Sequence, residues 1–199
     1  MELTEVIRNI NKSCAIYFPE SSFHLRPSKT NQFVISGNNV SKALNNFKNG
    51  SEQITAIKWF DDFWIYIILK VISEKTFISI SVFQGAEEDD FKSQLFRAEW
   101  DDYQNPNEKH PQPHWHLMAN SVIHKSLSEI AHLDDSDILE SIINEEKSNI
   151  VEISKMHLPL NGNWFNGGSH INTITEKKKL VVWFKGILSC MKEQLEYAR

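Results

Sequence analysis

The feature that most constrains the fold is Phe63–Ile72, a run of apolar residues, most of them aromatic or β-branched, interrupted only by Lys70. Such residues are enriched in β-strands, and the run is far shorter than the roughly 20 residues of a membrane-spanning helix. We therefore predict a strand within residues 56–73. A hairpin tip at Glu74-Lys75 and a returning strand over residues 76–83 complete the pattern.

Two more strands are predicted beyond an acidic connection at residues 85–90. Residues 94–103 indicate a third strand and residues 114–118 a fourth, separated by a loop that contains Asn105-Pro106-Asn107. Asparagine and proline in such clusters mark turns. Because each strand follows the previous one after a direct connection, we expect an antiparallel meander.

Helical periodicity is found towards both ends of the chain. Apolar residues from Leu3 to Ile10 recur at helical spacing and predict an amphipathic helix over residues 2–13. The pattern is helical again from residue 121, and Thr175 is the predicted N-cap of a C-terminal helix. The apolar face of this last helix comprises Leu180, Trp183, Phe184, Ile187, Leu188, Met191 and Leu195.

The residues between the first helix and the β-rich centre are less regular. Residues 32–35 indicate a short strand. Val40, Leu44 and Phe47 have helical spacing and predict a short helix that Gly50 ends.

These elements predict one α+β domain over residues 1–199, with a β-rich centre at about 54–118 and a helical C-terminal part at about 121–199. A chain of this length can bury a core of its own. The order of elements favours an antiparallel β-meander of about four to six strands, with the N-terminal helix and the C-terminal helices packed on one face.

Composition argues against several classes of protein. The first residues lack the basic and apolar regions of a secretory signal, and no apolar run is long enough to span a membrane. Cys14 and Cys190 lie near opposite ends of the chain, as expected for reduced cysteines that pack as small apolar residues. We therefore expect a cytoplasmic protein without a membrane partner.

The net charge of −5 is concentrated in one acidic segment, residues 87–108. This segment contains eight acidic and two basic side chains, a net charge of −6, so the remaining residues carry +1. Surfaces that bind nucleic acids are usually basic, so a nucleic-acid partner is not expected. The acidic segment instead favours a protein partner with a basic surface.

The candidate site lies between the predicted third and fourth strands. Side chains alternate between the two faces of a strand, so Glu99 and Asp101 share one face, as do His114 and His116. Residues directly opposite each other in paired strands have Cβ atoms about 4.5–5.5 Å apart. The register, which the sequence leaves open, therefore decides whether carboxylates and imidazoles meet.

Three roles are open to these four residues. The carboxylate of Glu99 and the imidazoles of His114 and His116 are a workable ligand set for zinc or a similar divalent ion. His157 is the best additional ligand from elsewhere in the chain. The four residues, with His110 in the intervening loop, could instead supply the general acid and base of a metal-free reaction. They could also form a polar network that only fixes strand register.

The strand with Arg97-x-Glu99, the loop and the His-x-His strand together resemble the small toxin proteins of bacterial toxin–antitoxin modules. The resemblance covers only residues 97–117, and no residue role is carried over from it. It implies a prokaryotic accessory or defence-type system. We expect the chain to act there as a non-catalytic adaptor that binds a protein partner through the acidic segment. The alternative is a metal-dependent or acid–base hydrolase, nucleases included, that uses the four residues above.

Overall fold

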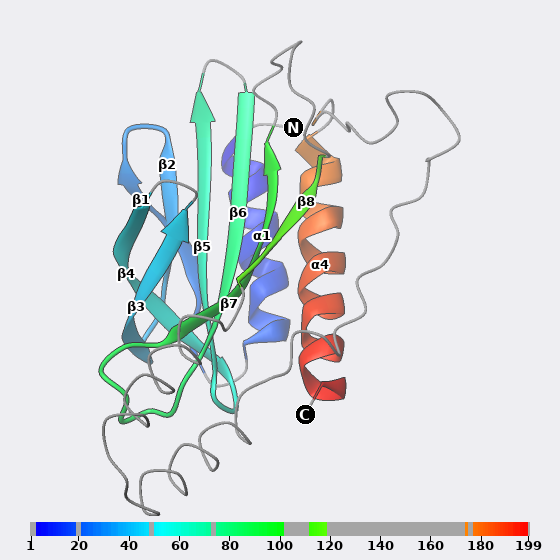
Figure 1. The fold of residues 1–199 in the computed structure, drawn as a ribbon. Helices are drawn as coiled ribbons and strands as arrows, with labels where there is room; N and C mark the ends of the chain where they lie inside the picture. The colour runs from blue at the N-terminus through cyan, green and yellow to red at the C-terminus, as the bar shows by residue number, and fades with distance from the viewer. Residues whose placement is uncertain are drawn as a thin grey trace, which may run out of the picture.

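The computed structural model describes residues 3–18, 21–47, 50–72, 75–101, 112–118, 174 and 177–198. Its elements, in chain order, are α1 (Leu3–Tyr17), β1 (His24–Lys29), β2 (Gln32–Ser36), β3 (Val40–Phe47), β4 (Gly50–Phe60), β5 (Phe63–Ile72), β6 (Lys75–Gln84), β7 (Ser93–Asp101), β8 (His114–Leu117) and α4 (Lys177–Tyr197). The strands form one sheet, and α1 and α4 lie side by side against it (Figure 1).

The sheet contains the antiparallel series β5–β6–β7–β8, in which β8 is the last strand. In the β5–β6 hairpin, Phe63 pairs with Gln84 and Ile72 with Lys75, so the pairing runs along both strands. β7 pairs with β6, and the short strand β8 pairs with β7. The predictions of an antiparallel sheet and of a helix at each end are therefore confirmed.

One face of the sheet carries the main core. Ile78, Ile80 and Val82 of β6 are 0% exposed and belong to the same apolar cluster as side chains of both helices. Val6 and Ile10 contribute from α1. The buried stripe of α4 comprises Leu180, Val181, Phe184, Leu188, Met191 and Leu195. The helices thus cover one face of the sheet, as the sequence predicts.

The β3–β4 hairpin packs on the opposite face of β5 and β6. The second, smaller core that it forms there comprises Ala43, Ile54, Ala56, Trp64 and Phe83. Oδ1 of Asn45 accepts hydrogen bonds from Oγ of Ser81 (2.8 Å) and from Nε2 of Gln94 (3.0 Å). The sheet therefore curls so that β3 approaches β7.

The predicted helix over residues 40–47 is wrong, because these residues form β3. Ala43 and Asn45 are 0% and 2% exposed, whereas Val40 and Leu44 are exposed. The buried side chains thus follow the two-residue period of a strand. Pairing with β4 along the whole of β3 decides the outcome.

The described part of the chain has eight strands, more than the four to six predicted. Residues 56–73 divide between β4 and β5 at Asp61, whose φ of 48° suits a turn that Asp tolerates. The helical segments predicted from residue 121 up to the C-terminal helix lie outside the described residues, as does the N-cap at Thr175. None of the described helices combines the length and apolar character needed to cross a membrane.

Candidate metal centre

The pairing of β7 with β8 brings four polar side chains together. Glu99 lies directly opposite His114, and Arg97 lies opposite His116. Ala98, between Arg97 and Glu99, points to the other face and belongs to the main core. Because side chains alternate along a strand, the four polar side chains occupy the face that points away from the helices.

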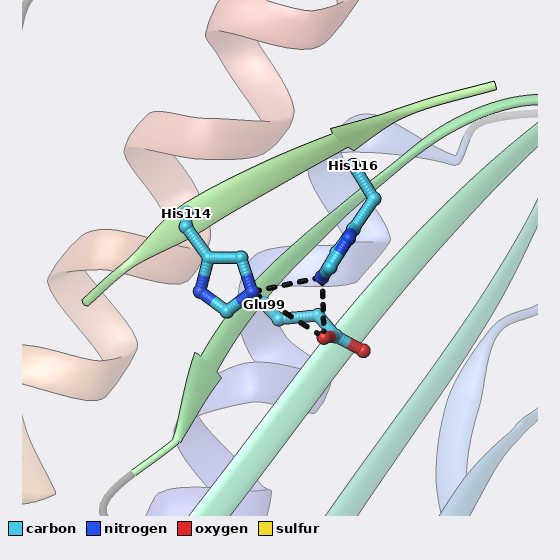
Figure 2. Close-up of side chains that lie close together, drawn as sticks. All are labelled: Glu99, His114 and His116. Carbon is cyan, nitrogen blue, oxygen red and sulfur yellow. Dashed lines mark hydrogen bonds and ion pairs between the residues drawn. The ribbon is translucent and has the colours of Figure 1, made fainter. Parts of the chain in front are cut away.

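The side chains of Glu99, His114 and His116 converge on one point. Nε2 of His116 lies 3.0 Å from Oε2 of Glu99 and 2.8 Å from Nε2 of His114. Nε2 of His114 lies 3.7 Å from the same Oε2. Figure 2 shows both imidazoles reaching from β8 towards the Glu99 carboxylate on β7. Among the described residues, these three form a group whose ligand atoms all lie within 4.8 Å of one another.

The group is buried on one side and accessible on the other. The side chains of Glu99 and His114 are 10% and 14% exposed, whereas that of His116 is 37% exposed. A small molecule would therefore approach from the side of His116. Electrostatic interactions at the buried end are screened only weakly by salt and solvent.

Arg97 is the immediate neighbour of the group. Its Nε lies 2.7 Å from Oε1 of Glu99, and its Nη1 donates a hydrogen bond to the backbone carbonyl of Asn46 in β3. Arg97 thus links the Glu99 carboxylate to the β3–β4 hairpin. It contacts Oε1, while Oε2 faces the two imidazoles.

Protons alone satisfy the two short contacts of His116 only in part. A ring nitrogen of histidine is either a hydrogen-bond donor or an acceptor. Nε2 of His116 therefore has at most one proton, which it can give to Glu99 or share between Glu99 and His114, so the two contacts cannot both be full hydrogen bonds donated by this atom. A metal ion, in contrast, accepts a lone pair from each of the three atoms at once.

The three atoms are also close enough together for one ion to reach all of them at the bond lengths of zinc. A triangle with sides of 2.8, 3.0 and 3.7 Å has a circumscribed radius of about 1.9 Å, so an ion about 0.8 Å above its plane would lie about 2.05 Å from each atom. Zinc binds histidine nitrogen and carboxylate oxygen at roughly 2.0–2.2 Å. Within the part of the chain that the structure describes, the two nitrogen ligands and one oxygen ligand leave the fourth position open, as in catalytic zinc sites.

Not every residue singled out in the sequence joins this group. Asp101 is not part of it: it ends β7, and its backbone N–H donates to Oε1 of Gln112 at 3.0 Å. His110 and His157 lie outside the described residues. No role is predicted for Arg97 from the sequence. The signal that could have found it is its position two residues before Glu99, which puts both side chains on the same face of one strand.

No family model, curated protein sequence or solved structure matches this chain.

Proposed function

We propose that the protein is a metal-dependent hydrolase whose ion is held by Glu99, His114 and His116. The observation that carries the proposal is the convergence of one carboxylate oxygen and two imidazole nitrogens within 4.8 Å of one another. We propose zinc as the ion, because two histidines and one glutamate are a known ligand set of catalytic zinc and the spacing of the atoms suits its bond lengths.

The open fourth position supports a hydrolytic role. Zinc lowers the pKa of a bound water to about 7, so that hydroxide is available near neutral pH as a nucleophile. By accepting a fifth ligand, the same ion would also polarise the carbonyl or phosphoryl oxygen of a substrate. The exposure of His116 leaves this position accessible from solvent.

Metal content is the direct test of the proposal. Protein freed of any affinity tag, exposed to Zn²⁺ and then freed of excess ion should retain one zinc per chain by elemental analysis. Zn²⁺ should also raise Tm, because an ion that binds only the folded state stabilises it. The double variant His114→Ala, His116→Ala should lose both effects. Hydrolysis of bis(p-nitrophenyl) phosphate should require the bound zinc.

His24→Ala is the matched control, because His24 is an exposed histidine on β1. This variant should bind zinc as the wild type does. A wild type without stoichiometric zinc, or a double variant that still binds it, would contradict the metal centre. Preference for iron over zinc would contradict hydrolysis, because two-histidine, one-carboxylate iron sites serve oxygen chemistry.

A second candidate function is an adaptor that binds a basic protein partner through the acidic connection, residues 85–90. The observation in its favour is that all four acids from Glu87 to Asp90 are exposed, next to Phe91, which is 45% exposed. Nζ of Lys92 donates hydrogen bonds to three backbone carbonyls of the connection. A connection held in this way loses less conformational entropy when it binds a partner.

Charge reversal tests the adaptor function. The variant Glu88→Lys, Asp90→Lys should no longer capture a partner in a pull-down, although its circular dichroism should match that of the wild type. Glu87 is retained because its carboxylate lies 3.2 Å from Nζ of Lys58. Glu5→Lys, which reverses an exposed acid on α1, is the control and should not affect capture. Capture that survives the double reversal excludes the connection as the interface.

A further inference from the structure

We propose that the metal-loaded centre binds an oxyanion, such as a phosphoryl group, at its open position, and that Arg97 sets this preference. The proposal rests on the metal-dependent function above and names the substrate class of that site. It is argued from the charges that surround the ion and from the way in which Arg97 holds Glu99.

The charges around the ion do not balance. The side chains of Arg97 and Glu99 are 5% and 10% exposed, and their ion pair is neutral as a whole. Histidine binds a metal through its neutral imidazole. Among the described residues, the side chains around a divalent ion therefore leave both of its positive charges uncompensated. A buried charge is costly unless an opposite charge accompanies it, so the fourth position favours an anion.

Arg97 is the residue that creates this imbalance. Without its guanidinium, the carboxylate of Glu99 would offset one of the two charges of the ion. Asp101 lies two residues further along the same face of β7, but it is partly exposed, so solvent screens its charge.

Arg97 also determines how Glu99 meets the ion. Its Nε contacts Oε1 at 2.7 Å, which leaves Oε2 to act as the ligand. A carboxylate that used both oxygens would occupy part of the position that the substrate needs. The hydrogen bond from Nη1 to the carbonyl of Asn46 holds the guanidinium in place. Residues that orient metal ligands in this way commonly change metal affinity by 10–100-fold when they are replaced.

The test uses protein loaded with Co²⁺, because the visible absorption of cobalt reports changes in its ligands. Inorganic phosphate, added at saturating Co²⁺, should change the spectrum of the wild type. In Arg97→Gln the phosphate Kd should rise about tenfold or more, because a nearby positive charge is lost at a buried site. Arg97→Lys keeps the charge, so it should bind phosphate within a few-fold of the wild type while it binds Co²⁺ more weakly. Arg26→Gln removes an exposed arginine on β1 and is the control.

Each outcome decides the proposal. A wild-type spectrum that phosphate leaves unchanged overturns it, and so does equal phosphate affinity in the wild type and Arg97→Gln. Should Arg97→Gln fail to fold, as judged by circular dichroism, the decision passes to Arg97→Lys, in which a tenfold loss of phosphate affinity overturns the role of charge. A wild type that binds neither Zn²⁺ nor Co²⁺ contradicts the metal centre itself, whereas metal binding without phosphate binding contradicts only this inference.

Discussion

Lys92 is a buried lysine that interacts with the part of the acidic segment that precedes it in the sequence. Its side chain is 2% exposed, and its Nζ donates to the carbonyl of Asp89 at 2.8 Å and lies 4.9 Å from the centre of the Trp64 ring. Burial lowers the pKa of Lys92, whereas the nearby carboxylates, Asp89 foremost, raise it. Some of the acids therefore support a buried lysine, in addition to any role on the surface.

Gly37 is a position where a single methyl group should be costly. A Cβ added there would lie 2.5 Å from the carbonyl oxygen of Ser22 and 3.1 Å from Cγ2 of Ile57. Because a backbone atom cannot move aside as a flexible side chain can, Gly37→Ala should lower the free energy of unfolding by about 1–3 kcal/mol. Urea denaturation followed by circular dichroism measures this loss.

Gly186 provides the opposite case. It lies in α4, and an added Cβ would meet no atom within 4 Å. Alanine is favoured over glycine within a helix, so Gly186→Ala should raise the free energy of unfolding by about 0.5–1 kcal/mol. The two variants should therefore shift the denaturation midpoint in opposite directions. A Gly37→Ala variant that is as stable as the wild type would contradict the packing described at Gly37.

Among the elements, β3 is held on the sheet by side-chain hydrogen bonds to β6 and β7. Asn45 is 2% exposed and accepts hydrogen bonds from Ser81 on β6 and Gln94 on β7. Asn45→Ala leaves both donors without this acceptor, so the free energy of unfolding should fall by about 1–3 kcal/mol. The double variant Asn45→Ala, Ser81→Ala should lose less free energy of unfolding than the two single variants lose in sum. The difference, which is the coupling free energy, should be about 0.5–3 kcal/mol. Chemical denaturation of the four proteins gives this coupling.

Ser189→Ala is the control for this cycle. Ser189 lies on α4, on the other side of the sheet, and donates a hydrogen bond to Glu193 of the same helix. Its effect should add to that of Asn45→Ala within about 0.5 kcal/mol. If the effects of Asn45→Ala and Ser81→Ala were also additive, the hydrogen bond between the two residues would not hold β3 on the sheet.

Across the whole molecule, the sequence predicts those elements whose signal is local. The two helices follow from apolar spacing, and β5 and β6 follow from β-branched runs on either side of a tight connection. β3 could not be predicted in this way. Ala43 and Asn45 are buried because β3 packs on strands more than 30 residues away in sequence, and Val40 and Leu44 happen to share a helical spacing.

The candidate site, like the fold, could be predicted only where the sequence signal is local. Strand parity selects Glu99, His114 and His116 from a polar stretch without any knowledge of the partner strand. The register that sets Glu99 opposite His114 cannot be obtained from parity, because parity gives the face that each side chain occupies and not its position along the partner strand. Asp101 lies on the same face of β7 as Glu99, but it is beyond the residues of β7 that pair with β8.

The placement of the centre on the face away from α1 and α4 has a consequence for how such a chain can diversify. The side chains of its three ligands lie on one face of the sheet, and those of Ile78, Ile80 and Val82 lie on the other face, against the helices. Sequence drift in the helices would alter stability and leave the ligand geometry in place. Conversely, replacement of the ligands would require no repacking of the main core. One set of strands can therefore keep its core while the chemistry of its other face changes.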